Sequence, residues 1–228
     1  MNYAIILAGG SGTRAGGTLP KQFQMINGVR MLWWSILAFK KFDPAIQIIL
    51  VVNPDFIDRW ESMFGEEEHS LGLDIIKVKG GRSRVESVKN GLKYISGHKT
   101  ENDDGRIVYI HDSARPFVSP ELISRGAGIV ESGKGVIPVV PLTDSIRKLA
   151  GGTSKAVDRN EYFAVQTPQI FLFEDIWDAY NSLEDETGMT DDASIAEHNG
   201  IEILTFEGDP ENFKVTTTSD LRRIGSLD

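Results

Sequence analysis

The chain begins with an apolar stretch of strand length that ends in a glycine-rich loop. Residues 3–7 are almost continuously apolar, and the loop at 9–14 contains three glycines and one arginine. A strand that is apolar on both faces is typical of a parallel sheet covered by helices. Open α/β sheets bind ligands where such strands end, and backbone N–H groups beside a cation favour phosphates. The start of the chain therefore predicts an α/β protein with an anion site beside its first strand.

Strand-like and helix-like segments alternate along the rest of the chain, which supports the same fold class. With 228 residues and 40% hydrophobic content, the chain is expected to form a single domain, residues 1–228, with a sizeable core. The expected strands are 3–7, 47–52, 74–78, 106–110, 136–139, 163–166 and 201–206. The expected helices are 31–40, 56–64, 83–94, 120–131, 173–182, 192–198 and 218–224.

Residues 141–160 interrupt this alternation. Their pattern predicts two short strands on either side of the turn Gly151-Gly152. A two-stranded hairpin that protrudes from a domain buries little of its own surface, so it needs another surface to pack on. A second subunit is one candidate for that surface.

The composition argues against several classes of protein. A net charge of −9 and a pI near 5.0 argue against general nucleic-acid binding, which uses a basic surface. The chain has no cysteine, so disulfides, thiol nucleophiles and cysteine metal sites are excluded. The N-terminal apolar stretch is too short for a membrane span and lacks the charged segment that begins a signal peptide. The expectation is a cytoplasmic protein without a membrane partner.

Two familiar phosphate-binding motifs do not account for the first loop. Residues 10–15 satisfy the dinucleotide pattern G-x-G-x-x-G/A, but Gly16, Gly17 and Pro20 interrupt the helix that this pattern requires. The segment 30–35 supplies no acid for a ribose, and no Walker A sequence occurs in the chain. An ordinary glycine-rich turn remains open as the alternative.

Polar and charged residues follow several of the expected strands. Asp112, just past the fourth strand, is placed to bind Mg²⁺ or a substrate hydroxyl, with capping of a turn as the alternative. Arg115 is placed to bind a phosphate or to pair with Asp112, while His111 is expected to be structural. Farther along the chain, Thr190 or Asp191 is expected to cap a helix, and a structural role is favoured for Asp192.

Cations at strand ends of an acidic protein predict two anionic ligands, although each cation alone also fits an exposed surface residue. Nucleotidyl transfer depends mainly on positioning and on charge neutralisation by Lys, Arg and Mg²⁺. A phosphate nucleophile is largely ionised at neutral pH, so the reaction needs no general base. The cations are Arg14, Lys21, Arg84, Arg115, Arg159 and Lys214.

These residues belong to a longer set of motifs. The set comprises LAGGSGTR at 7–14, PKQ at 20–22, GG at 80–81 with Arg84 and Ser87, HDSARP at 111–116, VDRN at 157–160, QTPQ at 166–169, TDDA at 190–193 and FKVT at 213–216. In order and spacing it resembles the 2-C-methyl-D-erythritol 4-phosphate cytidylyltransferase family over essentially the whole chain. The resemblance implies a Rossmann-like nucleotidyltransferase fold, a mostly parallel twisted sheet flanked by helices, with a protruding β-arm that locks a homodimer. It also implies a transferase of the non-mevalonate isoprenoid pathway that joins CTP to the polyol phosphate, releases pyrophosphate and uses Mg²⁺.

The resemblance implies roles for individual residues. Arg14 and Lys21 are expected to stabilise the transition state at the α-phosphate. Arg159 and Lys214 are expected to position the acceptor phosphate, with Arg159 reaching the site of a neighbouring subunit. The residues expected to line the CTP pocket are Ala8, Gly9, Gly10, Gly81, Arg84, Ser87 and Ser113. The residues expected around the acceptor are Asp112, Arg115, Ser145, Thr167 and Thr190, with Asp112 also a candidate Mg²⁺ ligand.

The chain departs from the commonest family pattern at three positions. Arg82 stands where an acid is frequent, which bears on the contacts to the ribose or base. Ser113 stands where Ala is usual, and Ser145 stands where Thr is usual but retains the hydroxyl.

Other functions remain open from the sequence alone. A ribitol 5-phosphate cytidylyltransferase shares several motifs, including His-Asp-x-x-Arg-Pro-Phe, which Phe117 completes, although the segment 157–160 favours methylerythritol phosphate. A sugar 1-phosphate nucleotidyltransferase is a second alternative, but the presence of the later motifs would then be a coincidence. A nucleotide-binding regulatory module without turnover would tolerate loss of Arg159 and Lys214, and a dehydrogenase would need the interrupted dinucleotide motif.

Overall fold

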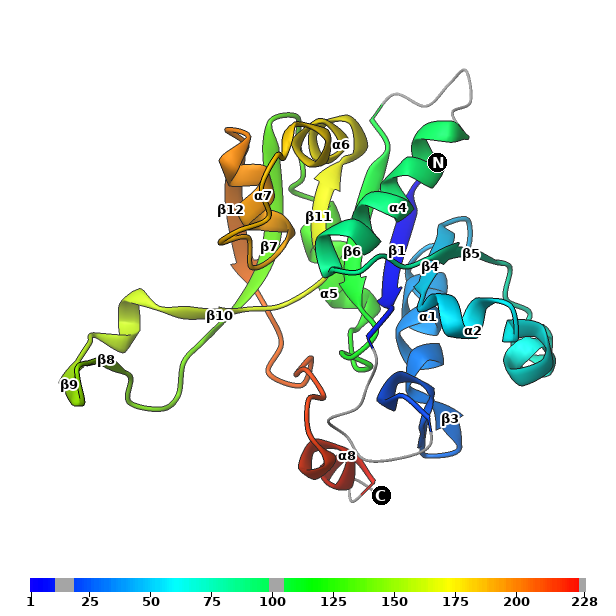
Figure 1. Cartoon of the computed structure of the whole chain (residues 1–228), viewed down its shortest axis with the longest axis horizontal. Helices are drawn as coiled ribbons and strands as arrows, with labels where there is room; N and C mark the ends of the chain where they lie inside the picture. Colours follow the sequence, from blue (N-terminus) through cyan, green and yellow to red (C-terminus); the bar gives the residue numbers. More distant parts are fainter. Residues whose placement is uncertain (11–18, 99–104, 226–228) are drawn as a thin grey trace.

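The computed structural model describes residues 1–10, 19–98 and 105–225. Within them, eight strands form one sheet, in the order β10-β7-β11-β6-β1-β4-β5 with β12 beside β7 (Figure 1). Strands β1, β4, β5 and β6 are mutually parallel, as are β7 and β12, whereas β10 and β11 are antiparallel to their neighbours. The bounds are β1 Tyr3–Ala8, β4 Gln47–Val52, β5 Ile75–Lys79, β6 Ile107–Asp112, β7 Lys134–Pro141, β10 Phe163–Val165, β11 Gln169–Leu172 and β12 Glu202–Glu207. The predicted mostly parallel α/β sheet is confirmed.

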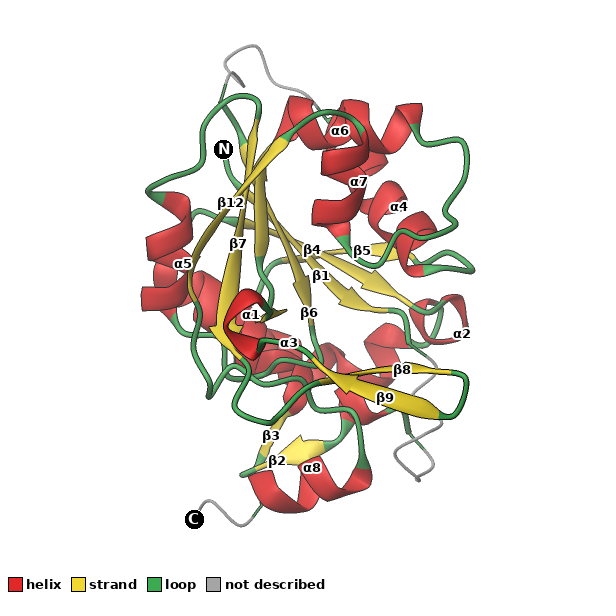
Figure 2. Cartoon of the chain, turned by 90° about the vertical axis from the view of Figure 1, so that its left-hand side faces the viewer, coloured by secondary structure: helices red, strands yellow, loops and turns green. Residues whose placement is uncertain are grey.

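Helices cover both faces of this sheet (Figure 2). Helices α1 (Met31–Phe42) and α5 (Pro120–Ala127) lie on one face, and α4 (Arg84–Gly97), α6 (Phe173–Ser182) and α7 (Asp192–His198) lie on the other. Successive residues of a strand face opposite sides, so an unbroken apolar strand supplies both cores. In β1, Ile6 belongs to the core under α1, while Ile5 belongs to the core under α4.

Local side-chain caps define where several of these helices begin. Ser83 accepts a hydrogen bond from the backbone N–H of Glu86 at the start of α4, and Ser119 caps α5 in the same way. Of the two caps predicted for α7, Thr190 and Asp191, the structure uses Asp191, which forms a capping box with Ser194. Such caps satisfy backbone N–H groups that a helix leaves without internal partners.

The predicted helix at 56–64 is wrong in its bounds and regularity. The segment instead forms α2 (Pro54–Ile57), a π-helix η3 (Glu61–Gly65) and α3 (Glu66–Ser70). Asn53 caps α2 and Pro54 opens it, so the helical segment begins earlier than apolar periodicity indicates. It also continues farther, because Glu68 is buried between Trp60 and Lys77 and bonds to both. A buried acid does not register as a core position in a sequence pattern.

Two further differences concern short elements. Strand β11 was not among the expected strands, because its four residues directly precede α6 and carry no alternation of their own. The hairpin of β2 (Met25–Ile26) and β3 (Val29–Arg30) was also not expected. With α8 (Thr218–Ile224), these strands form a smaller body below the sheet (Figure 1). Its core contains Ile26, Met31, Val215 and Ile224. The short helix η2 (Lys21–Phe23) precedes the two strands, and its Phe23 belongs to the core under α1.

The arm at 141–160 protrudes from the sheet (Figure 1). Strands β8 (Arg147–Ala150) and β9 (Thr153–Ala156) pair antiparallel around Gly151 and Gly152, which have φ of 54° and 79°. The predicted pair of strands is confirmed. All residues of both strands are exposed, and the side chain of Leu149 is 78% exposed.

Candidate active site

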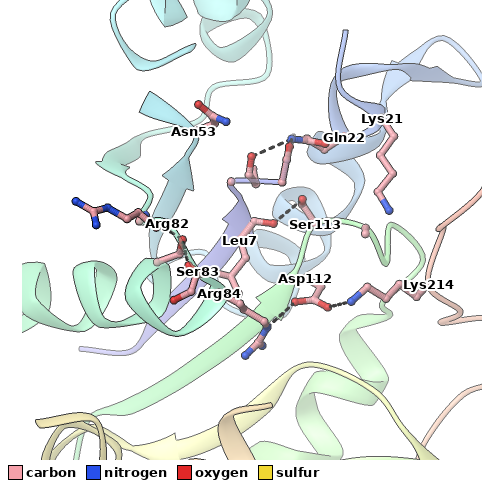
Figure 3. A pocket seen from close by; sticks show the side chains of 16 residues that line it. Leu7, Lys21, Gln22, Asn53, Arg82, Ser83, Arg84, Asp112, Ser113 and Lys214 are labelled. Carbon is pink, nitrogen blue, oxygen red and sulfur yellow. Dashed lines mark hydrogen bonds and ion pairs between the residues drawn. The ribbon is translucent and has the colours of Figure 1, made fainter. Parts of the chain in front are cut away.

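Parallel strands of the sheet end at one cavity of about 480 Å³. Its wall combines residues after β1, β4, β5 and β6 with the start of α4 and with two lysines from distant segments (Figure 3). The carboxyl edge of a parallel sheet is the usual ligand position in such folds. The lining residues are Leu7, Ala8, Gly9, Gly10, Lys21, Gln22, Asn53, Gly81, Arg82, Ser83, Arg84, Ser87, Asp112, Ser113, Ala114 and Lys214.

The described part of the first loop is fixed by a side chain from η2. The amide nitrogen of Gln22 donates to the carbonyl oxygens of Ala8, at 2.9 Å, and Gly10, at 2.8 Å. Gln22 is 3% exposed, and the adjacent Phe23 is buried among the rings of Phe56 and Phe64. The aromatic cluster therefore holds η2 in place, and Gln22 connects η2 to the end of β1.

The start of α4 presents a second set of polar groups to this cavity. The hydroxyl of Ser87 donates to the carbonyl of Ser83 at 2.8 Å and accepts from the backbone N–H of Gly81 at 3.0 Å. A Cβ atom on Gly81 would lie 2.3 Å from Cγ of Glu86, so the close approach requires glycine. A helix N-terminus with its positive dipole favours an anion. Arg82 is exposed at the rim, and its backbone N–H donates to Oε2 of Glu86 at 2.7 Å.

A second cavity of about 300 Å³ adjoins the first and shares Arg84, Asp112 and Lys214 with it. These three residues form a row of charges (Figure 3). Arg84 Nε lies 3.4 Å from Asp112 Oδ1, and Lys214 Nζ lies 2.6 Å from Asp112 Oδ2. The other lining residues are Arg115, Val165, Gln166, Thr167, Gln169, Thr190 and Asp191.

The charge states in this row follow from its pairing. Burial raises the pKa of Asp112, but the positive charges of Arg84 and Lys214 outweigh burial and hold that pKa well below its usual range. Burial lowers the pKa of Arg84, but Asp192 and Asp112 outweigh it and raise that pKa. Asp112 is therefore a carboxylate at neutral pH, with cations at both oxygens.

His111 shapes the second cavity without lining it. Its Nε2 lies 3.1 Å from the carbonyl oxygen of Arg115, and its Nδ1 lies 3.0 Å from the hydroxyl of Thr167. A carbonyl only accepts, so Nε2 carries the ring proton and Nδ1 accepts from Thr167. Burial lowers the pKa of His111 to about 4, which keeps the ring neutral at physiological pH. The expected structural role of His111 fits these bonds.

The segment that carries Lys214 is fastened to the site by several side chains. Arg115 donates to the carbonyl of Asn212 at 2.9 Å, and Lys21 donates to the carbonyl of Val215 at 2.5 Å. The amide of Asn212 donates to the carbonyl of Thr167 at 2.9 Å. The alternative of an Arg115–Asp112 pair is not what the structure shows, because the Arg115 guanidinium bonds to backbone carbonyls of Asn212 and Val165.

The structure brings most of the predicted site residues to the two cavities. Ser145 and Arg159 lie elsewhere, in the exposed arm, where Arg159 donates to the carbonyl of Thr143. Arg14 lies outside the described residues. The residues that line at least one cavity are Ala8, Gly9, Gly10, Lys21, Gly81, Arg84, Ser87, Asp112, Ser113, Arg115, Thr167, Thr190 and Lys214.

The sequence reasoning left Gln22 and Asn53 without a role in the site. Gln22 belongs to the Pro-Lys-Gln motif, which is the signal that points to it. Asn53 follows the second expected strand directly, in the position where polar residues at a sheet edge meet a ligand. Ser113 lines the first cavity, but its hydroxyl donates to the carbonyl of Leu7 at 2.7 Å and so ties β6 to β1.

A protein cage for a metal ion is not evident in the part of the chain that the structure describes, which contains no group of three or more His, Cys, Asp or Glu residues suited to one. Asp112 is a hard oxygen donor of the kind that Mg²⁺ prefers, but both of its oxygens already face cations. Within the same described ranges, no helix is both long enough and apolar enough to cross a membrane.

Comparisons with known proteins agree with this geometry. The sequence model of the 2-C-methyl-D-erythritol 4-phosphate cytidylyltransferase family matches residues 2–225. A protein of that name from Bacteroides thetaiotaomicron is 41% identical over 222 residues, which are 97% of this chain and 96% of the relative. One from Cereibacter sphaeroides is 39% identical, over 98% of this chain and 95% of the relative. The crystal structure of 4-diphosphocytidyl-2C-methyl-D-erythritol synthase from Anaerococcus prevotii covers 98% of this chain and 96% of its own, with a TM-score of 0.79 at 25% identity.

Proposed function

The chain belongs to the 2-C-methyl-D-erythritol 4-phosphate cytidylyltransferase family, and from this premise we propose how its two cavities carry out the family's reaction. The substrates are CTP and 2-C-methyl-D-erythritol 4-phosphate, and the products are 4-diphosphocytidyl-2-C-methyl-D-erythritol and pyrophosphate. The enzyme is a nucleotidyltransferase of the non-mevalonate isoprenoid pathway. The triphosphate occupies the larger cavity, and the polyol phosphate occupies the smaller one.

One observation carries this assignment of the cavities. Arg84, Asp112 and Lys214 line both cavities, so two ligands that meet there share one row of charges. The larger cavity adds Lys21, the backbone of the first loop and the N-terminus of α4, which together suit several phosphates. The smaller cavity adds Thr167, Thr190 and Asp191, whose oxygens suit the hydroxyls of a polyol.

The chemistry requires positioning and charge neutralisation. A phosphate oxygen of the acceptor attacks the α-phosphorus of CTP, a new P–O bond forms, and the bond to the β-phosphate breaks to release pyrophosphate. The acceptor phosphate is ionised at neutral pH, so no side chain has to remove its proton. We propose that Lys21 and Arg14 stabilise charge at the α-phosphate, and that Lys214 holds the acceptor phosphate beside it.

We propose that Mg²⁺ enters the site bound to the triphosphate. Mg²⁺ commonly takes one or two carboxylates together with substrate phosphates and water, rather than an all-protein cage. Asp112 is a carboxylate that lines both cavities, and its role as a Mg²⁺ ligand stays a prediction. When bound, the ion would supply further neutralisation of the phosphate oxygens.

We propose that the working enzyme is a homodimer joined by the arm. The exposed apolar side chains of Leu149, Tyr162 and Phe163 lie along the arm and its base, where a partner would cover them. Arg159 lies outside both cavities of its own chain, which fits a role in the site of the partner. The single-domain organisation and the cytoplasmic location stay predictions.

The decisive experiment is pyrophosphate release by the purified protein with CTP and Mg²⁺. Methylerythritol 4-phosphate should support turnover, and ribitol 5-phosphate at the same concentration should not. Turnover with ribitol phosphate alone would contradict the proposed acceptor while leaving the nucleotidyl transfer intact. Binding of CTP without turnover on either acceptor would contradict the assignment as an enzyme of this reaction.

A further inference from the structure

One buried carboxylate beside the site has no part in the mechanism above. Asp192 is the first residue of α7 and is fully buried. Its two oxygens accept from Arg84, from Nη1 at 2.9 Å and from Nη2 at 2.6 Å, and Oδ1 also accepts from the hydroxyl of Tyr180 at 2.6 Å. A buried charge destabilises a fold unless it is paired and hydrogen-bonded. The environment of Asp192 is therefore built around the guanidinium of Arg84.

Capping of α7 does not explain this carboxylate. The backbone N–H of Ser194 is satisfied by the side chain of Asp191 at 3.0 Å, and that of Ala193 is satisfied by Gln169 at 2.8 Å. The side chains that accept from these two backbone N–H groups are thus those of Asp191 and Gln169, and not that of Asp192. The charge of Asp192 thus serves Arg84 rather than the helix.

Asp192 extends the row of charges that separates the cavities. Along the row the signs alternate, from Asp192 to Arg84, then to Asp112 and Lys214. Asp192 lines neither cavity, whereas the other three line both. A bidentate carboxylate fixes both the position and the plane of a guanidinium. Asp192 therefore binds the Arg84 guanidinium from outside the two cavities.

On the basis of the proposed function, we propose that Asp192 is a positioning residue that acts through Arg84 on both substrates. Without its charge, Asp112 is the carboxylate that the structure leaves beside Arg84. The guanidinium would turn toward Asp112 and compete with Lys214 for it. Both the triphosphate and the acceptor phosphate would then meet cations in the wrong place, so binding of both substrates would weaken.

The test is the substitution Asp192→Asn, which keeps the size of the side chain and removes its charge. The expected result is a rise of about tenfold in KM for CTP and for the polyol phosphate, with a smaller change in kcat. A merely structural role would instead reduce the fraction of active protein, which lowers kcat and leaves both KM values unchanged. Glu174→Gln is the matched control, because it removes an ion pair with Arg106 in which neither partner lines either of the two cavities.

Two further variants keep the inference open to contradiction if Asp192→Asn does not fold. Tyr180→Phe leaves the carboxylate in place and removes only the hydroxyl that orients it, so both KM values should rise by about two- to threefold. In an Arg84→Gln background, either substitution should have no additional effect on KM. Unchanged KM values in the folded variants, or equal effects with and without Arg84, would overturn the inference. A wild-type protein without turnover would overturn the proposed function itself, and the inference with it.

Discussion

At the scale of single residues, the candidate site contains cations whose partners are already in place. Asp112 holds Lys214 and Arg84, while the carbonyl of Val215 holds Lys21. Side chains that are held in this way lose little conformational freedom when a ligand binds, which favours preorganised charge stabilisation. The contributions of Lys21 and Lys214, which we assign to the reacting phosphates, should therefore appear mainly in turnover.

Lys214 provides the first residue-scale prediction. Lys214→Gln should lower kcat/KM by about 10²- to 10³-fold, because a preorganised charge at the reacting phosphates is lost. The measurement is pyrophosphate release, with thermal unfolding to confirm the fold. Lys134→Gln is the control, since Lys134 pairs with Glu131 and Glu202 and lines neither cavity. Equal activity of the two variants would rule out the proposed role of Lys214.

His111 provides a prediction on stability and pH. Its pKa is about 4 in the folded chain, where burial disfavours the charged ring, against 6.5 as the ordinary value. Between these values the unfolded chain binds a proton that the folded chain does not, so the free energy of unfolding falls as the pH falls from 6.5 to 4. The loss from this group amounts to about 3 kcal/mol.

The measurement is urea unfolding at several pH values for the wild type and for His111→Gln. The variant should be less stable at pH 7, because Thr167 and the carbonyl of Arg115 lose their partner. Its stability should also fall less steeply between pH 6.5 and 4. Parallel pH profiles for the two proteins would show that His111 is not the group responsible.

At the scale of secondary-structure elements, glycines determine how closely helices approach the sheet. Gly126 lies in α5, and a Cβ atom there would lie 2.4 Å from Cδ1 of Ile170 and 2.9 Å from Cζ of Phe206. Gly97 ends α4, and, apart from its chain neighbours and the backbone of its own helix, no atom of the described residues lies within 4 Å of its Cβ position. The same substitution therefore has opposite consequences at the two positions.

Gly126→Ala should destabilise the protein by about 1–3 kcal/mol, because α5 would have to move away from β11 and β12. Gly97→Ala should be neutral or stabilise the protein by up to about 1 kcal/mol, because alanine favours a helix. Urea unfolding of both variants measures the difference. A similar free energy of unfolding for both would contradict the close packing of α5.

At the scale of the whole molecule, the arm is exposed in a single subunit, and its proposed role requires a second subunit. If Arg159 acts in the partner's site, then Arg159→Ala and Lys214→Ala chains should each be inactive alone. Mixed and refolded in equal amounts, they should recover about one quarter of wild-type activity, because half of the dimers are mixed and each mixed dimer has one intact site.

Sedimentation velocity of the same samples establishes whether they are dimers. No recovery in a mixture that forms dimers would place Arg159 in the site of its own chain. A wild-type protein that sediments as a monomer at assay concentration, yet turns over, would contradict the proposed dimer.

The sequence by itself determined the fold class and most of the site. Unbroken apolar strands such as residues 3–7 and 47–52 require two covered faces, and the polar motifs that follow them must meet at one edge of a parallel sheet. The resemblance to the family assigned Ala8 and Gly81 to the nucleotide and Asp112 to the acceptor, and the structure places all three around one cavity at this edge. Local chemistry also narrowed the cap of α7 to Thr190 or Asp191, and the structure shows that it is Asp191.

Only the tertiary structure decided how charges pair across the fold. The position of Asp192 at a predicted helix start favours a structural role for it. The sequence around Asp192 does not indicate that Arg84, 108 positions away, donates to both of its carboxylate oxygens. Glu68 is buried for the same kind of reason, because Lys77 and Trp60 approach it from other elements. The free energy of a buried charge depends on partners that packing supplies, and such partners leave no periodic pattern in the sequence.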